Sequence, residues 1–420
     1  MGKLEKYSSY KDSGVEWLGE IPEHWDTLAN KYIFKLKKNL VGKRSSEYDL
    51  LSLTLKGIIK RDMENPEGKF PAEFDTYQEV KQGDFVFCLF DVEETPRTVG
   101  LSQFDGMITG AYTVMDAKSM NKDYLYYFYL NLDSKKRMKP LYRGLRNTIP
   151  KDSFFSFKTF VPPKEEQTKI ASFLDEKTAQ IDNAINQKEK LIELLKERRQ
   201  ITINEAVTKG LNKDVEFKDS GVEWIGEIPK HWNLLANKHI FKLKKDTVGK
   251  NSSEYSLLSL TLQGIIKRDL DGGGKFPAEF DTYQEVKQGD FVFCLFDVEE
   301  TPRTVGLSEY DGMITGAYTV MSVQDMDRKY LYYFYLNLDS KKRLKPLYRG
   351  LRNTIPKDSF FAFKTFVPPK NEQIKIVEYI ETQTTKIDKA IELQQNYIAK
   401  LKEYKASLID SVVTGKVRVV

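Results

Sequence analysis

Two kinds of hydrophobic pattern alternate along the chain. Short aromatic and β-branched runs, such as DFVFCLF, MITGAYTVM and FKTFVPP, are separated by Gly, Pro and Asp and predict strands. YLYYFYLNLDSKKR predicts a helix within the same segment. After Pro162-Pro163 the pattern becomes one long helical stripe, with apolar residues at Ile170, Leu174, Ile181, Ile185, Leu191, Leu195 and Ile201. We therefore expect mixed α/β domains that are followed by long helices.

The whole pattern occurs twice. SGVEWLGEIPEHW at residues 13–25 returns as SGVEWIGEIPKHW at residues 220–232. From Phe70 to Met115 the copies differ only at Gln103/Glu309 and Phe104/Tyr310, and residues 124–164 differ from their copy only at Met138/Leu344 and Ser156/Ala362. The two globular segments must therefore share one fold and one surface chemistry.

The second long helix has a clearer seam than the first. Its apolar residues follow a near-heptad spacing, interrupted by polar Thr384, Gln394 and Lys405. They are Ile380, Ile387, Ile391, Ile398, Leu401, Leu408 and Val412. A coiled coil of about 40 residues is ~60 Å long, which suits a spacer between two domains.

The ends of the chain resemble its middle. The sequence VTKGLNKDVEFKDSGVEW leads from the end of the first helix into the second globular segment. The chain ends in VTGKVRVV and begins with a segment that contains KYSSYKDSGVEW. Bringing the termini together would recreate the internal junction. We expect a circularly closed, pseudo-twofold arrangement with antiparallel helices. The expected boundaries are residues 1–162 and 211–368 for the globular domains, and 163–210 and 369–420 for the helices.

Composition narrows the function classes only modestly. The 420 residues are 40% hydrophobic, and 66 Lys and Arg against 61 acids leave a net charge of +5, too small to indicate a nucleic-acid partner. Cys88 and Cys294 lie in identical apolar runs, where buried reduced thiols are expected. Without a signal-peptide pattern or a run of about 18 apolar residues, a cytoplasmic location is expected.

Two basic segments without acids and one polar loop are the candidate binding sites. SKKRMKPLYRGLRNTIPK at 134–151, KYIFKLKKNLVGKR at 31–44 and the loop FDVEETPRTVGLS all recur in the second copy, the second of them with changes. Lysines suit phosphate contacts, and forked Arg and amide side chains suit base edges, although such runs can also merely solvate a surface. The candidate DNA-binding residues are Lys43, Arg97, Thr98, Lys135, Lys136, Arg137, Arg143, Arg146, Asn147, Lys250, Arg303, Thr304, Lys341, Lys342, Arg343, Arg349, Arg352 and Asn353.

Motifs for catalysis are missing. DGGGKF has Phe276 where a Walker phosphate loop needs Ser or Thr. Three histidines and two isolated cysteines do not match metal-ligand spacings. The acid pair Glu93 and Glu94 is more typical of a solvated surface than of a magnesium site, and no methyltransferase Asn/Asp-Pro-Pro motif occurs. We expect no catalytic, cofactor or metal site in this chain.

Several of these motifs together resemble a known family. GVEWLGEIPEHW opens a domain, VPPKEEQTKIASFLDEKTAQID closes it, and LLKERRQITINEAVTKG ends a helix. These resemble the conserved regions of type I restriction-modification specificity subunits, and they do so twice. The resemblance implies two target-recognition domains that each read half of a bipartite DNA site. It also implies helices that hold two methyltransferase subunits and restriction subunits, with S-adenosylmethionine, ATP and magnesium bound by those partners.

The near-identity of the two copies adds an expectation of its own. Identical surfaces related by a pseudo-twofold axis would read an inverted repeat, with half-site centres on the order of 10 bp apart. Two alternatives remain open: a coiled-coil adaptor whose globular ends bind protein, and a self-sufficient DNA-modifying enzyme. Only the main interpretation and the enzyme predict DNA binding.

Overall fold

The chain forms two compact units that are each built from non-contiguous parts. The computed structural model describes residues 4–15, 19–63, 73–222, 225–269 and 279–419, so Phe276 lies outside the described residues. Unit 1 comprises residues 1–188 and 395–420, and unit 2 comprises residues 189–394. Each unit therefore contains one globular domain and about half of each long helix. The expected linear division at residues 162, 210 and 368 stays a prediction.

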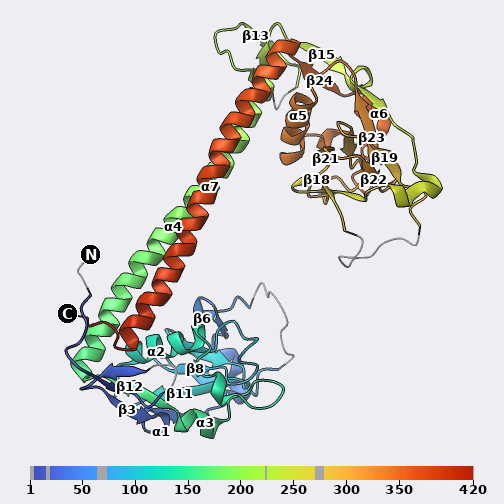
Figure 1. Cartoon of the computed structure of the whole chain (residues 1–420). Helices are drawn as coiled ribbons and strands as arrows, with labels where there is room; N and C mark the ends of the chain where they lie inside the picture. Colours follow the sequence, from blue (N-terminus) through green and yellow to red (C-terminus); the bar gives the residue numbers. More distant parts are fainter. Residues whose placement is uncertain (1–3, 16–18, 64–72, 223–224, 270–278, 420) are drawn as a thin grey trace. The chain divides into compact units, whose positions relative to one another are not determined.

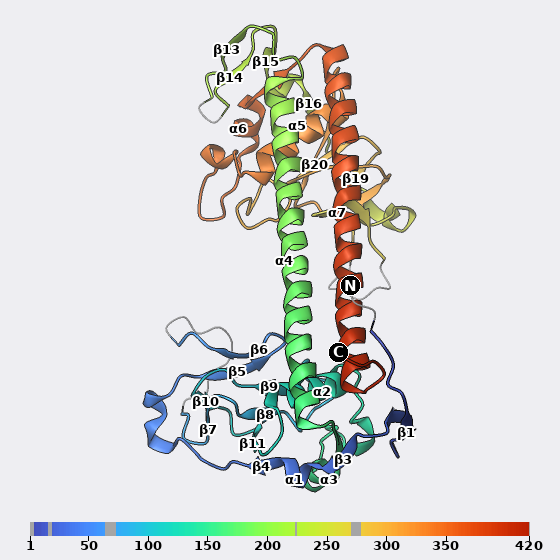
Figure 2. The same ribbon diagram turned by 90° about the vertical axis from the view of Figure 1, so that its left-hand side faces the viewer.

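The two long helices are antiparallel within each unit. They are α4 (Lys164–Lys209) and α7 (Lys370–Val413). In unit 1, Lys405 Nζ lies 2.6 Å from Asp182 Oδ2, and Lys188 Nζ lies 4.6 Å from the Tyr397 ring centroid. In unit 2, Arg199 Nε lies 3.6 Å from Asp388 Oδ1. Rising numbers on α4 thus meet falling numbers on α7, and both ribbon views show the helices side by side (Figures 1 and 2).

The predicted seam is correct on α7 but wrong on part of α4. On α7, Ile380, Ile387, Ile398, Leu408 and Val412 are buried. On α4, Ile170, Leu174, Ile181 and Ile185 are buried as well, but Leu191 and Ile201 are exposed. Buried Ile192 and Ile203 continue the stripe instead. The reason is geometric, since a stripe drifts around a helix whose spacing is not a strict heptad.

The globular domain of unit 1 is built around a four-stranded antiparallel sheet of order β4-β11-β8-β9. These strands are β4 (Phe34–Leu36), β8 (Phe85–Phe87), β9 (Val99–Leu101) and β11 (Thr113–Ala117). Smaller two-stranded pairs surround them: β1 (Tyr10–Asp12) with β2 (Glu20–Pro22), β3 (Asp26–Ala29) with β12 (Lys158–Val161), β5 (Leu51–Thr54) with β6 (Gly57–Lys60), and β7 (Gln78–Val80) with β10 (Gly106–Ile108). The helices are α1 (Asn30–Ile33), α2 (Lys122–Ser134) and α3 (Lys151–Ser156), with 3₁₀ turns η1 (Gly42–Glu47) and η2 (Lys139–Leu141). The mixed α/β prediction is confirmed.

Unit 2 repeats this architecture, with the sheet order β16-β23-β20-β21. Its strands are β13 (Phe217–Asp219), β14 (Glu227–Pro229), β15 (Asn233–Ala236), β16 (Phe241–Leu243), β17 (Leu258–Thr261), β18 (Gly264–Lys267), β19 (Gln284–Val286), β20 (Phe291–Phe293), β21 (Val305–Leu307), β22 (Gly312–Ile314), β23 (Thr319–Val323) and β24 (Lys364–Val367). Its helices are α5 (Arg328–Ser340) and α6 (Lys357–Ala362), with η3 (Asn237–His239), η4 (Gly249–Glu254) and η5 (Lys345–Leu347). The sequence repeat is therefore a structural repeat.

Aromatic side chains fill the core between the sheet and the helices. Phe34, Phe87 and Phe154 pack around Tyr129 of α2, and Phe85 packs against Phe34 and Phe87, with ring centroids 4.9–5.9 Å apart. The Tyr129 hydroxyl donates to Asn30 Oδ1 at 2.7 Å, which pairs its one buried polar group. Burial raises the pKa of Tyr129 well above its ordinary value of 10, so the hydroxyl stays protonated. This core fixes α2, whose C-terminal end leads into the basic segment.

The two described ends of the chain meet within unit 1. Arg418 N donates to Glu5 O at 2.7 Å and forms an isolated β-bridge with it. Gly415, at φ +73°, lies against Pro22 and Trp25, just as Gly210, at φ +70°, lies against Pro229 and Trp232 in unit 2. The ends thus reproduce the internal junction, as the sequence predicted.

Two further expectations concern burial. Cys88 and Cys294 are free and buried in their separate units, and burial raises the pKa of both thiols. No helix within the described part of the chain combines the length and the apolar character that crossing a bilayer requires.

Candidate nucleic-acid interface

A tight turn carries the central candidate residues. Arg143 and Thr148 exchange backbone hydrogen bonds of 2.8 and 3.0 Å, so residues 144–147 form its tip. Gly144 has φ +68° and Asn147 has φ +44°, a left-handed conformation that Gly and Asn adopt most easily. The sequence GLRN therefore folds into a projecting tip, and unit 2 forms the same turn at Arg349–Thr354.

The turn is joined to a second predicted segment, the loop that follows β8. Asp91 N donates to Arg146 O at 2.8 Å, and Ile149 N donates to Leu89 O at 2.8 Å. The Arg146 guanidinium also lies 3.1 Å from the Asp91 carboxylate. In unit 2, Asp297 N donates to Arg352 O at 2.8 Å. The structure thus places the two candidate segments side by side.

Sequence reasoning missed a third element of this surface. Arg97 Nη2 donates to the backbone oxygen of Leu55, in the turn between β5 and β6, at 3.1 Å, and Arg303 does the same to Leu262 at 2.8 Å. Residues 54–57, 91–97 and 142–148 therefore form one loop cluster, with 261–264, 297–303 and 348–354 in unit 2. The one signal in the sequence is a leucine in each turn, Leu55 and Leu262, because turns rarely contain leucine.

Four candidates have structural contacts that argue against DNA contact. Thr98 and Thr304 are 1% and 5% exposed, and their backbone N–H groups donate to the carboxylates of Asp133 and Asp339. Lys136 donates to Val92 O at 3.0 Å and Thr95 O at 3.2 Å, and faces Asp133 Oδ1 at 3.4 Å. Lys342 makes the corresponding contacts. The two lysine side chains thus hold the loop cluster to the end of α2 or α5, and the two threonines are buried, so the proposed contact set contains none of the four.

Arg137 and Arg343 instead face the long helices. Arg137 Nη1 lies 2.5 Å from Asp410 Oδ1 of α7, whereas Arg343 Nη1 donates to Asn204 Oδ1 of α4 at 2.8 Å. Burial alone would raise the pKa of Asp410, but hydrogen bonds from Lys416 and Arg137 outweigh it and the pKa is lowered. Burial also lowers the pKa of Arg343. These arginines therefore dock the domains on the helices.

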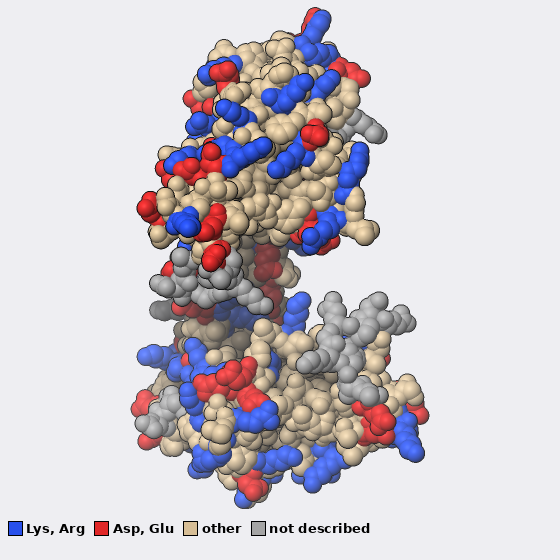
Figure 3. Space-filling model, turned by 90° about the vertical axis from the view of Figure 1, so that its right-hand side faces the viewer, with Lys and Arg blue, Asp and Glu red and all other residues tan. Residues whose placement is uncertain are grey.

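The remaining candidates keep accessible side chains. Arg97, Arg303, Asn147 and Asn353 are half-buried within the loop cluster. The exposed basic residues are Lys43, Lys135, Arg143, Arg146, Lys250, Lys341, Arg349 and Arg352. No described contact joins Lys43 or Lys250 to the loop cluster, so the prediction that they act with it is not tested by the geometry. Figure 3 shows that one face of each unit mixes Lys and Arg with Asp and Glu, rather than forming a uniformly basic surface.

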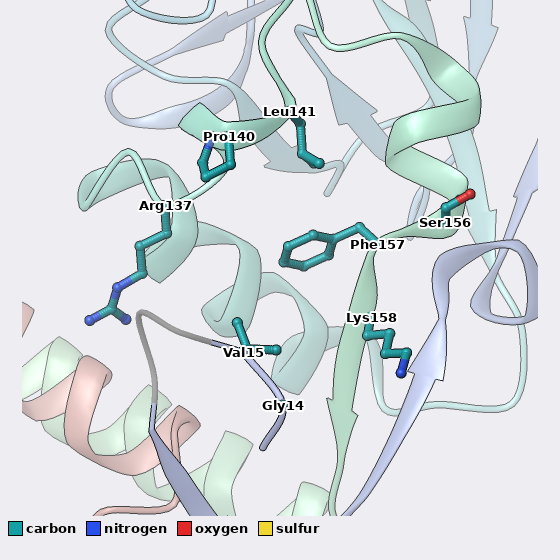
Figure 4. A pocket seen from close by; sticks show the side chains of 8 residues that line it. All are labelled: Gly14, Val15, Arg137, Pro140, Leu141, Ser156, Phe157 and Lys158. Carbon is teal, nitrogen blue, oxygen red and sulfur yellow. The ribbon is translucent and has the colours of Figure 1, made fainter. Parts of the chain in front are cut away.

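A hollow of about 780 Å³ lies elsewhere in unit 1. It is lined by Gly14, Val15, Arg137, Pro140, Leu141, Ser156, Phe157 and Lys158. Figure 4 shows Arg137 at one edge and Phe157 on the opposite wall. Arg137 is the one candidate residue in its lining, and its guanidinium is paired with Asp410. Among the described residues, no group of three or more His, Cys, Asp or Glu is placed to hold a metal ion.

The motif residues at the start of α4 have clear structural contacts. Glu166 accepts hydrogen bonds from the Tyr7 hydroxyl and from Trp25 Nε1 at 3.2 Å, and its other oxygen lies 2.8 Å from His24 Nε2. Gln167 accepts from Asn121 N, at the N-cap of α2, at 2.9 Å. In unit 2, Glu372 contacts His231 and Trp232 at 2.8 and 3.1 Å. The EQ motif therefore joins the domain opening and α2 to the long helix.

Comparison with known proteins agrees with this architecture. Residues 107–194 match the family model of the type I restriction modification DNA specificity domain. The chain is 24% identical to a putative type I restriction enzyme MjaX specificity subunit of Methanocaldococcus jannaschii, with 96% of both chains covered. It is 25% identical to the MjaVIII specificity subunit of that organism, with 75% of both covered. The chain is therefore similar to type I restriction-modification specificity subunits along nearly its whole length.

Solved structures from type I restriction-modification systems share the fold. The HsdS subunit from Thermoanaerobacter tengcongensis superimposes with a TM-score of 0.54 at 14% identity, covering 94% of this chain and 98% of that one. A chain from a study of assembly and conformational transition of the type I R-M system gives a TM-score of 0.68 at 12% identity, with the same coverage. Specificity subunits are non-catalytic members of type I systems, and DNA sequence specificity is the role of this family.

Proposed function

We propose that each loop cluster reads one half of a bipartite DNA site, and that both clusters read the same half-site. The observation that carries this proposal is that the surface is built twice with the same bonds. Asp91 N to Arg146 O and Asp297 N to Arg352 O are both 2.8 Å, and Lys136 and Lys342 each donate to the adjacent loop at 3.0 Å. Because the two loop clusters have the same side chains and the same backbone hydrogen bonds, they should prefer the same bases.

The composite site is then an inverted repeat. The antiparallel pairing of α4 and α7 within each unit supports this, since exchanging two antiparallel helices is a twofold operation. Each half-site lies in the major groove, with centres on the order of 10 bp apart and a spacer of several base pairs between them.

Within a half-site the residues divide by chemistry. Arg146 and Asn147, with Arg352 and Asn353, lie at the turn tips and read base edges, because forked side chains recognise guanine and adenine. Arg97 and Arg303 line the same cluster. The exposed lysines and arginines that remain contact phosphates and position the domain. These are Lys43, Lys135, Arg143, Lys250, Lys341 and Arg349.

The long helices bind the partner subunits. On α4, exposed Leu191, Leu194 and Ile201 lie at spacings of three and seven residues and therefore share one face. On α7, exposed Tyr397 and Tyr404 are likewise seven residues apart. Exposed apolar side chains on these helices are suited to docking two methyltransferase subunits, to which the restriction subunits are added. S-adenosylmethionine, ATP and magnesium then act in those partners.

Methylome sequencing tests this function directly. Cells that express the chain with its methyltransferase subunit should gain one methylated motif, and that motif should be an inverted repeat with an unread spacer. An asymmetric bipartite motif would contradict the same-half-site proposal. Binding that is indifferent to salt would favour the protein-interaction adaptor, because phosphate contacts release counterions. Modification of DNA by the chain alone would favour the enzyme.

A further inference from the structure

The most exposed apolar side chains of the described residues lie at the turn tips of the loop clusters. Leu145 and Leu351 each have a relative exposure of 104%, as great as in an extended peptide. Leu55 and Leu262, in the neighbouring turns, reach only 64% and 65%. An exposed leucine forgoes about 1.5–3 kcal/mol of burial. A leucine that projects completely from a tight turn is therefore suited to a contact outside the chain.

The turn prevents this leucine from folding back onto its own domain. Asn147 N donates to Gly144 O at 3.3 Å, and the backbone pair between Arg143 and Thr148 closes the turn beneath it. Arg146 O is fixed by Asp91 N. A Cβ built on Gly144 would meet nothing within 4 Å, so the space beside the leucine is open. The side chain is held outward before any partner binds.

The charges around the leucine indicate the occupant. Arg143 and Arg146 flank it, both exposed. Arg143 Nη1 donates to Tyr142 O at 2.8 Å, while the Arg146 side chain is 77% exposed and its Nη2 lies 3.1 Å from Asp91 Oδ2. An apolar tip between two arginines is complementary to an apolar group inside an anionic groove. The thymine methyl group in the major groove of duplex DNA has this character.

We propose that Leu145 and Leu351 each recognise the methyl group of a thymine in the half-site, beside the base pair that Arg146 or Arg352 reads. This rests on the proposed function, because it places the turn in the major groove. Consecutive Cα atoms are about 3.8 Å apart and consecutive base pairs about 3.4 Å apart. Leu145 and Arg146 therefore match neighbouring base pairs. The half-site must contain a thymine at that position.

Replacing thymine by deoxyuridine removes only the methyl group and tests the proposal. The probe is a duplex carrying the motif found by methylome sequencing, bound by the full chain in complex with its methyltransferase subunits. One thymine per half-site should be sensitive, with uracil there weakening binding about fourfold per half-site, the effect of losing one buried methyl group. The Leu145→Ala, Leu351→Ala variant should bind thymine and uracil probes equally.

Control variants separate this contact from other roles. Leu28→Ala with Leu235→Ala changes partly exposed leucines of both units outside the loop clusters and should keep the uracil effect. Leu145→Met with Leu351→Met should retain it in part. The proposal is supported if the Leu145→Ala, Leu351→Ala variant loses the difference in binding between thymine and uracil probes and the control variants keep it.

Four outcomes overturn it. A motif without thymine, or wild-type binding that is unchanged by uracil at every thymine, removes the methyl contact. If the alanine variant bound both probes more weakly than wild type by the same factor, it would keep the preference for thymine, and the leucine would then contact something else. A rise in 2-aminopurine fluorescence that needs Leu145 would indicate a wedge between bases. In each case specific, salt-dependent binding can persist, so the proposed function fails only if the wild-type complex shows none.

Discussion

The docking of each domain on the helices gives a prediction with an internal reference. Arg137 and Arg343 occupy equivalent positions in the two copies. Arg137 donates a hydrogen bond to Asp410, whereas Arg343 donates one to Asn204. The Asp410→Asn variant therefore gives unit 1 the contact that unit 2 already has. Asn131 Nδ2 donates to Asp410 Oδ1 at 3.1 Å, and Asn337 Nδ2 donates to Asn204 Oδ1 at 3.2 Å. The geometry is compatible with either side chain.

The magnitude follows from that comparison. Breaking a buried ion pair costs about 3–5 kcal/mol when a charge is left without a partner. Here the amide oxygen of asparagine still accepts from Arg137, but the amide nitrogen cannot accept from Lys416, so that contact and the ionic part of the Arg137 pair are lost. A hydrogen bond to a charged group contributes about 1.5–3 kcal/mol and a neutral one about 0.5–1.5 kcal/mol. Asp410→Asn should therefore destabilise unit 1 by about 1–2 kcal/mol, and Asn204→Asp should stabilise unit 2.

Hydrogen exchange measured by mass spectrometry resolves the two units. Amides of α2 should exchange faster in Asp410→Asn, while amides of α5 should not change, because opening free energies report local stability. The folded pKa of Asp410 is depressed below its ordinary 3.8, so its contribution is complete above that value and is lost as the pH falls through the folded pKa. The difference from wild type should be constant from pH 5 to 8. Equal exchange in α2 at pH 7 would refute the reasoning.

The remaining predictions concern DNA contacts and the helix junction. Arg146→Ala with Arg352→Ala should cost about 1–3 kcal/mol per half-site on cognate DNA and much less on random DNA in titrations of the complex. Lys135→Ala should weaken binding to both DNAs alike. It should also reduce the slope of log binding constant against log salt concentration by about one. Glu166→Gln should lower stability by about 1–2 kcal/mol in urea unfolding, because three donors share that carboxylate. Exposed Glu165→Gln is its control, and an equal loss there would remove the junction argument.

The fold was largely predictable because repeats and periodicity are properties of the sequence. Identical strings fixed the duplication, and the heptads of α7 predicted its buried face. The error at Leu191 and Ile201 has a physical origin. The seam of α4 is weak between Ile185 and Ile203, and only the packing of α7 selects Ile192 over its apolar neighbour. Periodicity alone cannot choose between two adjacent stripes.

The site was less predictable because its residues are alike in type and differ in contacts. Lys135 and Lys136 are neighbours in a basic run, but the first is exposed and the second donates to two carbonyls beside Asp133. Nothing local distinguishes them, since Val92 and Thr95 are far away in sequence. A polar side chain beside Arg97 makes Thr98 a candidate for DNA contact in the sequence. In the structure Thr98 is buried, because it directly precedes strand β9, which begins at Val99.

The unlike docking contacts leave the geometry of the proposed reading surface unchanged. Asp410 and Asn204 differ in charge, and Arg137 and Arg343 therefore differ in their electrostatic surroundings. The bonds that fix the turn do not follow this difference, because Arg143 N to Thr148 O and Arg349 N to Thr354 O are both 2.8 Å. The rigid end of α2, held by Lys136, lies between the two sites. Asp410→Asn should consequently change the stability of unit 1 and leave the methylated motif unchanged.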